Sequence, residues 1–361
     1  MLIAHRIEGT LQPWTEGLLN TLLKLAPLPA GLQSASDAKP PPRVLLTPTT
    51  KDKLGQSTDP MDADSRYRTA FVLKNERITA SDWYQDVRHF EFNFKDDVQY
   101  DPGDVAVIHP NAEDGDVSEF LELMKWSDVA DIPMDIQRNV HGMRFWLSSR
   151  GQANGHISDQ SLPDFLPEVS TLRTLFTRYL DFNAVPRRSF FHYLRFFTTD
   201  ERELEKLDEF LSSEGADELY EYTERVRRTI AEVLTEFRNV KIPIDYILDV
   251  FPPLRPRHFS IASSVKVHPQ QMHLCVAIVG YRTKLRVPRK GVCTSYLARL
   301  GPGDTLRIGL LKGLIRLPPD LETPVICVGP GTGIAPMRAL IEERVHKGSR
   351  GRLTQPTLEP N

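Results

Sequence analysis

Residues 255–264 read Arg255-Pro256-Arg257-His258-Phe259-Ser260-Ile261-Ala262-Ser263-Ser264 and combine a cation, an aromatic ring and a hydroxyl on one extended segment. In a β-strand, successive side chains point to opposite faces. Arg257 and Phe259 are therefore expected on one face, and His258 and Ser260 on the other. Two faces of one short strand can then contact the same ligand.

These three side-chain types suit a flavin nucleotide. The guanidinium of Arg257 can neutralise a pyrophosphate, the ring of Phe259 can lie against a planar aromatic system, and Ser260 can hydrogen-bond at the ring edge. A half-buried strand with a surface arginine is the alternative, because short apolar runs with one basic residue are common. The segment alone leaves both interpretations open.

Two glycine-containing turns follow this segment. Residues 291–297, Gly291-Val292-Cys293-Thr294-Ser295-Tyr296-Leu297, predict a turn that opens into a short helix, and backbone amides at a helix start bind phosphate. Residues 323–328 predict a buried strand that runs into a glycine loop at 329–336 and a helix at 337–346, the pattern of a nucleotide cradle. A tight structural turn is the alternative for one such loop, but three elements in this order are a stronger signal.

The order RHFSIASS, GVCTSYL, VGPGTGIAP resembles the diflavin reductase family, which includes microsomal cytochrome reductases and the sulfite reductase flavoprotein. Upstream segments at 75–79, 90–92, 227–230 and 242–246 most resemble the branch of NADPH-dependent diflavin oxidoreductases that serves cytosolic iron–sulfur protein assembly. The likeness covers roughly residues 65–345.

The resemblance implies a set of FAD contacts. Arg257 pairs with the FAD pyrophosphate, Phe259 replaces the more usual tyrosine on the isoalloxazine, and Ser260 lies near the atom that receives hydride, which makes Ser260 the expected catalytic residue. His258 occupies a variable position of the same motif. The further residues expected at the cofactors are Gly291, Val292, Cys293 and Thr294 at the pyrophosphate, Arg227 or Arg228 at the flavin or its phosphates, and Thr332 at NADPH.

Thr332 also has a simpler interpretation as a helix-capping threonine, which the same loop geometry would allow. The resemblance further implies that FMN belongs to the full-length relatives, with no FMN site expected in this chain.

The expected fold class is α+β: an antiparallel β-barrel of the ferredoxin–NADP reductase type with an inserted helical subdomain, followed by the start of a Rossmann-like NADPH domain. The expected divisions are a remnant of the last FMN-domain helix at 1–31, a linker at 32–66, the FAD-binding barrel at 67–162 and 238–320, a helical connecting subdomain at 163–237, and a truncated NADPH-binding domain at 321–361. The apolar stripe of Trp14, Leu18, Leu22 and Leu25 suggests the first of these, with an N-terminal helix docked on the barrel as the alternative.

Composition and charge agree with a cytoplasmic protein. A net charge of -3 gives no electrostatic reason to expect nucleic acid or an anionic membrane as a partner. The three cysteines lie far apart and predict neither a disulfide framework nor a zinc site. No apolar run is long enough for a membrane span, and the first ten residues lack the core of a signal peptide.

The expected function is flavin electron transfer, with hydride passing from NADPH to FAD and single electrons passing through FMN to an anamorsin-type iron–sulfur assembly protein in the full-length relative. One alternative is a truncated FAD-binding module without turnover, because one strand and one helix cannot make a Rossmann domain. A relative of the cytochrome or sulfite reductase flavoproteins is another. A barrel that serves only as a protein-binding scaffold is the weakest.

Overall fold

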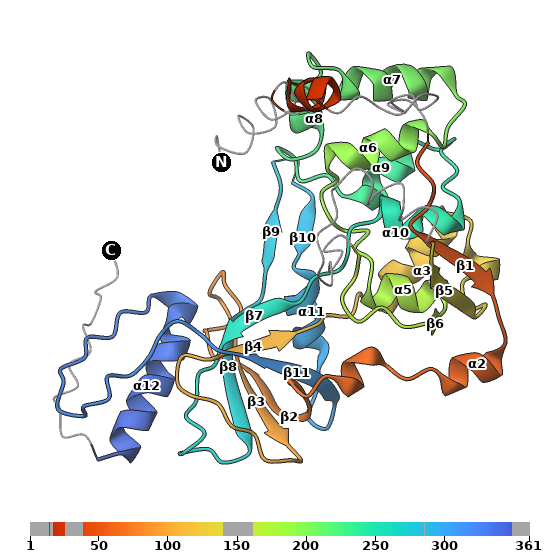
Figure 1. The fold of residues 1–361 in the computed structure, drawn as a ribbon. Coiled ribbons are helices and arrows are strands. Elements are labelled where there is room, and N and C mark those ends of the chain that lie inside the picture. The colour runs from red at the N-terminus through yellow and green to blue at the C-terminus, as the bar shows by residue number, and fades with distance from the viewer. Residues whose placement is uncertain (1–13, 15–16, 26–38, 140–161, 285, 349–361) are drawn as a thin grey trace.

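Six antiparallel strands form a nearly closed barrel in the lower part of Figure 1. In the order of their pairing these are β7 (Arg257–Ser260), β4 (Val105–Ile108), β11 (Thr305–Leu311), β2 (Tyr67–Arg77), β3 (Val87–Phe94) and β8 (Gln271–Ala277). An isolated bridge between Ile261 and Leu274 links the two ends of the sheet. The computed structural model describes residues 14, 17–25, 39–139, 162–284 and 286–348.

Alternation along the strands decides which side chains fill the barrel. Phe90, Phe92 and Phe94 of β3 are buried inside, while the residues between them face outward. Their rings pack with Met272, Leu274 and other side chains of the same apolar core. The antiparallel barrel and the accompanying helices confirm the expected α+β fold class.

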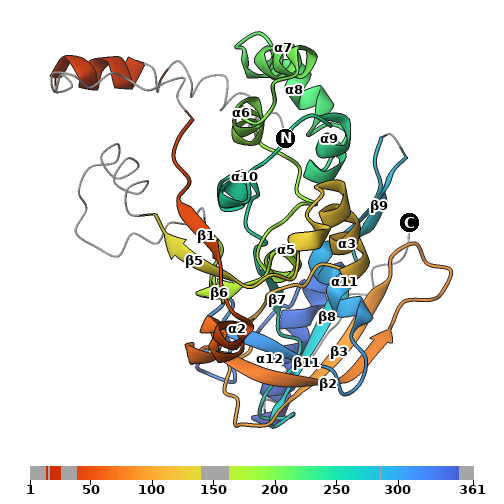
Figure 2. The same ribbon diagram turned by 90° about the vertical axis from the view of Figure 1, so that its right-hand side faces the viewer.

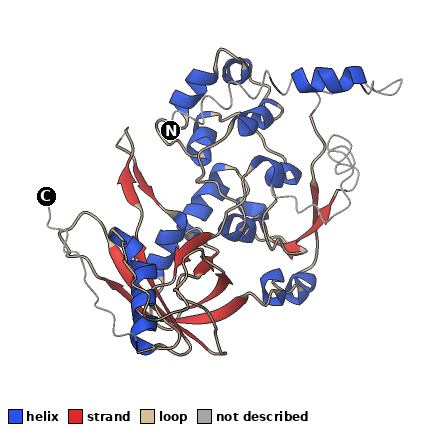
Figure 3. Ribbon diagram, turned by 60° about the vertical axis from the view of Figure 1, so that its left-hand side comes forward, coloured by secondary structure: helices blue, strands red, loops and turns tan. Residues whose placement is uncertain are grey.

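A second apolar core lies in a helical subdomain above the barrel, and Figure 3 shows most of the helices gathered apart from the barrel strands. Phe120, Phe176 and Phe251 pack ring against ring at its centre. The helices are α3 (Asp114–Leu123), α5 (Leu172–Arg178), α6 (Arg188–Arg195), α7 (Glu201–Leu211), α8 (Ala216–Tyr222), α9 (Ile230–Glu236) and α10 (Ile247–Val250), with short 3-10 turns at Ser127–Val129 and Ile244–Tyr246.

The subdomain boundaries differ from the expected ones. Within the expected linker, β1 (Val44–Pro48) pairs with β5 (Met134–Arg138), and β5 pairs with the two-residue β6 (Val169–Ser170). Helix α2 (Lys51–Gln56) and the 3-10 turn Pro60–Ala63 follow. The side chains of Val44 and Leu46 pack in the helical core. The polar composition of residues 32–66 as a whole therefore gave no sign of this short strand.

Parts of the expected barrel also pack in the helical core. These are the segments around α3 and α10, whose buried residues include Val117, Phe120, Ile247 and Phe251. The reason is physical: each carries an apolar face that the barrel sheet, already closed around its own phenylalanines, has no room to bury. The division between helical and barrel parts therefore does not follow one continuous stretch of sequence.

One hairpin and one helix connect the two parts. Strands β9 (Gly280–Arg282) and β10 (Pro288–Lys290) rise from the barrel toward the helices, as Figures 1 and 2 show, and helix α11 (Val292–Arg299) begins directly after them. Arg289 of β10 donates to the carbonyl oxygen of Arg227 and pairs with Glu232 of α9. The helical subdomain is thus fixed to the turn that precedes α11.

The C-terminal segment corrects one expectation. Helix α12 (Ile334–His346) forms after the 3-10 turn Gly331–Gly333 and packs against β8. The strand expected at 323–328 is absent from the described residues: that stretch has no ladder partner, and Ile326 and Val328 are 89% and 72% exposed. A strand needs a neighbour to pair with its backbone groups, and none lies beside this one here.

At the other end, residues 17–25 are helical and their apolar stripe is exposed, with Leu25 79% accessible. The alternative of a helix docked on the barrel is therefore not seen. The rest of the expected FMN-domain remnant lies outside the described residues. None of the described helices has the length and apolar character needed to cross a membrane.

Candidate functional site

Strand β7 carries the predicted site at one end of the barrel sheet. It pairs along one side with β4, with Phe259 opposite Ala106 and His258 opposite Val107. Phe259 is half-buried against the barrel core, whereas His258 lies on the other face and lines a cavity of about 380 Å³ with Tyr67 and His109. The alternation expected from the sequence is therefore present, and His258 points away from the face of Arg257 and Phe259.

The other predicted side chains of β7 are accessible. Arg257 and Ser260 are exposed, and the Arg257 guanidinium donates to the backbone oxygen of Arg255. A cation and a hydroxyl are thus accessible at the surface beside a half-buried ring. This is an arrangement that a ligand with a planar ring and a phosphate can cover.

The start of α11 lies close to Arg257. Burial raises the pKa of the Cys293 thiol to about 12, and the positive charge of Arg257 opposes that shift. A thiol with such a pKa does not ionise at neutral pH, so Cys293 offers a ligand its backbone amide only. The first amides of any helix lack intrahelical partners, and those of α11 are therefore available to an anion.

Asp181 is a member of this neighbourhood that sequence analysis missed. Burial raises the pKa of its carboxyl, while the backbone amide of Asn183, 3.0 Å away, and the charge of Arg257 act in the opposite direction. Asp181 follows an apolar helix in the sequence, and nothing in its local pattern distinguishes it from a surface residue. Only the tertiary structure brings it near Arg257.

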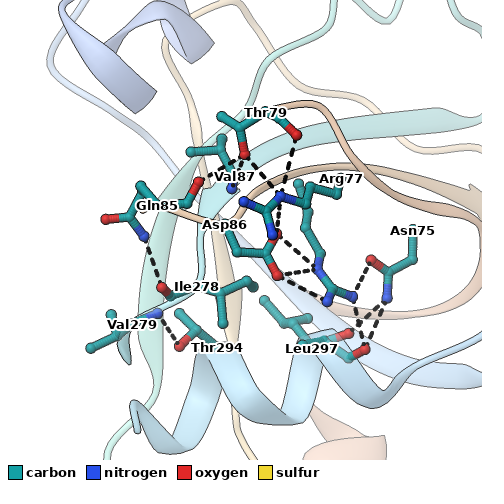
Figure 4. A network of polar contacts seen from close by, with 12 residues as sticks. Asn75, Arg77, Thr79, Gln85, Asp86, Val87, Ile278, Val279, Thr294 and Leu297 are labelled. Atoms are coloured by element: carbon teal, nitrogen blue, oxygen red, sulfur yellow. Dashed lines mark hydrogen bonds and ion pairs between the residues drawn. The ribbon is translucent and has the colours of Figure 1, made fainter. Parts of the chain in front are cut away.

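Gly291 permits a tight turn before α11. Its amide donates to the carbonyl oxygen of Val279 at 3.0 Å, and an added Cβ would lie 2.7 Å from Thr294 Oγ1 and 2.8 Å from Val279 Cβ. Figure 4 shows Thr294 and Val279 joined across this turn. A side chain at position 291 would therefore force the strand end and the helix start apart.

Thr294 contributes to the same turn. Its hydroxyl accepts from the amide of Val279 at 3.0 Å and donates to the carbonyl oxygen of Gly291 at 3.2 Å. The side chain is buried, and these two bonds turn its hydroxyl toward the protein. Thr294 therefore stabilises the turn.

A polar network from the loop between β2 and β3 supports the same turn (Figure 4). The side chain of Gln85 donates to the carbonyl oxygen of Ile278 at 2.8 Å, next to Val279. Asn75 Nδ2 donates to the last carbonyl oxygens of α11, the shortest contact being 2.7 Å to Leu300. Arg88 joins this end, contacting Asn75 Oδ1 at 3.2 Å and the carbonyl oxygen of Ala298 at 3.1 Å.

Arg227 is near the site through its backbone. It has a left-handed backbone conformation with φ 56°, its carbonyl oxygen accepts two bonds from Arg289, and its exposed side chain pairs with Glu224 at 3.3 Å. Arg289, which holds this backbone segment, is the residue that sequence reasoning overlooked here. Its position two residues before Gly291 was the available signal.

Thr332 lies in the turn that precedes α12, at a half-buried position. The alternative of a capping threonine is not seen, because Gly333 occupies the N-cap position of α12 and no side chain caps the helix. Gly329 needs to be glycine, since a Cβ there would lie 2.4 Å from the carbonyl oxygen of Gly333. The loop is therefore a tight turn with backbone groups at its surface.

Comparison with known proteins gives a consistent result. The family model described as FAD binding domain matches residues 59–296. The chain is 36% identical to NADPH-dependent diflavin oxidoreductase 1 of Cryptococcus neoformans over 381 residues, which covers 95% of this chain and 59% of the relative. The relative of the same name from Danio rerio is 38% identical over 94% of this chain and 56% of its own length. The relative from Schizosaccharomyces pombe is 37% identical over 79% of this chain and 46% of its own length. The chain thus spans less than two thirds of these relatives.

Proposed function

Since the chain belongs to the family of NADPH-dependent diflavin oxidoreductases, we propose that it forms the FAD-binding part of a flavoprotein that carries hydride from NADPH to FAD and single electrons onward through FMN. FAD, when bound, supplies the conversion between two-electron and one-electron transfer. The residues of this chain bind and orient the cofactor.

The observation that carries the proposal is that an exposed guanidinium, Arg257, and the free amides of the first turn of α11 occur in one neighbourhood, where the charge of Arg257 acts on Cys293. The guanidinium and the free helix amides are both suited to a pyrophosphate. Gly291 keeps that turn free of a side chain, which agrees with close approach of a phosphate to backbone. These residues supply the donors that the pyrophosphate of a flavin nucleotide requires.

Phe259 and Ser260 complete the proposed site. The half-buried ring of Phe259 offers one flat face for the isoalloxazine, and its anchorage in the barrel core fixes the orientation of that ring. The exposed hydroxyl of Ser260 is available as a hydrogen-bond donor at the reactive edge, which supports its role as the catalytic residue. His258 shares the face of Ser260 and lines the adjoining cavity.

We place NADPH at the turn before α12, with Thr332 as a side chain that contacts it. The backbone of residues 329–333 and the start of α12 support this assignment. The proposed onward path leads through an FMN-bearing module to an iron–sulfur assembly protein of the anamorsin type, in the cytosol. This part of the proposal rests on the family and on the resemblance of the sequence.

Absorption spectra of the purified 361-residue chain test the proposal. We expect bound flavin in the wild type, or after reconstitution with FAD, and at least tenfold weaker FAD binding in Arg257→Ala, since a charged contact contributes about 1.5–3 kcal/mol. Arg255→Ala is the matched control: Arg255 lies just outside β7 and forms an exposed pair with Asp164 at 3.4 Å. Equal FAD affinity in Arg257→Ala and the control would reject the assignment.

Anaerobic addition of NADPH then separates turnover from binding. Rapid bleaching of the flavin would support a working reductase in this chain. Flavin that stays oxidised would favour the second candidate, an FAD-binding module without turnover. The exposed Ile326 and Val328, which lack a strand partner among the described residues, are the observation that favours it.

A further inference from the structure

Three potential metal ligands lie together on the outer face of the barrel. His89 and Glu91 belong to β3 and His273 to β8. One ligand atom from each lies within 4.8 Å of the other two. Neither the family's name nor the proposed electron transfer assigns a function to this cluster, which is called the His–Glu–His cluster below.

Strand geometry holds the cluster in place. Glu91 and His273 are directly opposite each other in the antiparallel register, and His89 lies two residues from Glu91 on the same face. The intervening Phe90 and Phe92 are fully buried in the barrel core and fix the orientation of β3. Two histidines and a carboxylate from two rigid neighbouring strands form a preorganised donor set.

The donor chemistry suits a cation. His89 and His273 offer imidazole nitrogens and Glu91 offers a carboxylate oxygen. Divalent transition metals accept both ligand types.

The surrounding charges define what a cation must displace. Arg338 of α12 lies 3.3 Å from His273 Nδ1, and Gln271 Oε1 lies 3.3 Å from His273 Nε2. Arg338 is itself paired with Glu342 at 2.9 Å, and His268 lies 3.5 Å from the same carboxylate. Lys74 is 3.7 Å from Glu91 Oε1. A bound cation therefore replaces one contact of His273 and the 3.0 Å His89–Glu91 hydrogen bond.

We propose that His89, Glu91 and His273 bind a divalent transition metal, with Zn²⁺ the best match to two imidazoles and one carboxylate. Zinc–ligand bonds of about 2.0–2.2 Å place ligand atoms roughly 3.4 Å apart in a tetrahedron, so side-chain rotation by about an ångström closes the set. Solvent takes the fourth position. The donor set excludes Mg²⁺ and Ca²⁺, which prefer oxygen ligands.

The metal has a structural consequence. It ties β3 to β8 and competes with Arg338 for His273, and Arg338 lies on α12, the helix that follows the proposed NADPH turn. Metal binding is therefore expected to loosen one contact between α12 and the barrel. The inference is independent of flavin binding, because the cluster shares no residue with the proposed FAD site.

Cobalt titration of the chelator-treated full chain tests the proposal. We expect one Co²⁺ per chain with the intense ligand-field bands of tetrahedral coordination, and full bleaching of these bands by one equivalent of Zn²⁺. His273→Gln and Glu91→Gln should each weaken Co²⁺ binding at least tenfold. His268→Gln is the matched control. His268 does not belong to the cluster, although its ring centroid lies only 4.3 Å from that of His273.

Wild-type protein without these bands, or with equal binding in His273→Gln, would overturn the proposal. Loss in His268→Gln to the same extent would also overturn the assignment of the ligands. Circular dichroism checks that each variant is folded. If a variant does not fold, the titration of the wild type still tests whether the protein binds Co²⁺ with tetrahedral coordination. Arg257→Ala should keep the cobalt bands while binding FAD poorly, which distinguishes failure of the metal site from failure of the flavin site.

Discussion

Several residues at the proposed flavin site shape the turn before α11 and keep side chains away from its surface. Cys293 is buried and un-ionised, Thr294 turns its hydroxyl inward, and Gly291 has no side chain. The result is a turn whose ligand-facing surface is backbone, beside the side chains of Arg257 and Phe259. Residues that seemed from the sequence to contact the cofactor directly are thus in part residues that shape the turn.

Gly291→Ala should disrupt this turn. The new Cβ would meet Thr294 Oγ1 at 2.7 Å and Val279 Cβ at 2.8 Å, and overpacking of this kind costs about 1–3 kcal/mol. We expect a lower urea midpoint and weaker FAD binding. Gly280→Ala is the control, because a Cβ at Gly280 meets nothing within 4 Å. Identical unfolding and FAD binding of the two variants would contradict the close approach.

Among the elements, α11 depends on contacts at both of its ends. The N-terminal end is fixed by the Gly291 turn, and the C-terminal end by Asn75 of β2, whose amide donates to three of its carbonyl oxygens. The last carbonyl oxygens of a helix have no intrahelical donor, so they need such partners. A residue far upstream in the sequence therefore stabilises the helix that faces the proposed pyrophosphate.

Asn75→Ala should lower the free energy of unfolding by about 1–3 kcal/mol, because buried carbonyl oxygens lose their donor. FAD affinity should fall as well, since the start of α11 moves with its end. Asn93→Ala on β3 serves as the comparison: within the described residues its side chain has no hydrogen bond. Chemical denaturation of both variants gives the result, and equal stability would argue against a role for Asn75.

Asp104 joins the start of β4 to the segment after β11. Its carboxylate contacts Lys312 at 3.0 Å, Arg316 at 2.9 Å and the amide of Gly313 at 3.2 Å. Burial alone would raise its pKa, but the amide of Asp101 and the contacts with Lys312 and Gly313 outweigh it and lower the pKa. The ionised form is thus the form that the folded state favours.

The pH dependence follows from this direction. A lowered folded-state pKa gives stability that is fully present above the unfolded value, about 3.9, and that is lost as pH falls through the folded value. Asp104→Asn should therefore be less stable than the wild type at pH 7, with the difference shrinking below about pH 4. Urea unfolding across this range is the measurement. A difference that stays constant with pH would show that ionisation of Asp104 contributes nothing.

In the whole molecule, the barrel and the helical subdomain have separate apolar cores, and the β9–β10 hairpin spans the space between them (Figure 1). Arg289 supplies the polar contact at its far end, with the Arg227 carbonyl oxygen and Glu232 as partners. The position of the Gly291 turn is therefore coupled to the helical subdomain.

Arg289→Ala should weaken this coupling. Loss of a partly buried charge-assisted contact should cost about 1.5–3 kcal/mol, and FAD binding should weaken because the hairpin leads directly into the Gly291 turn. Arg282→Ala is the control, because Arg282 lies on the neighbouring strand, is exposed and has no ion pair within the described residues. Thermal unfolding followed by flavin fluorescence compares them. If Arg289→Ala and the control have the same thermal stability and FAD binding, other contacts position the hairpin.

The sequence by itself determined the barrel, the alternation of side chains along Arg257–Ser260, and the turn at Gly291. These are local properties: side-chain alternation and glycine spacing are set by a few neighbouring residues. The tertiary structure alone decided that β1 packs in the helical core, that Arg289 reaches Arg227, and that Asn75 supports α11, because such contacts join residues far apart in the chain. It also decided that residues 323–328 form no strand, since pairing depends on a neighbour that a local pattern cannot reveal.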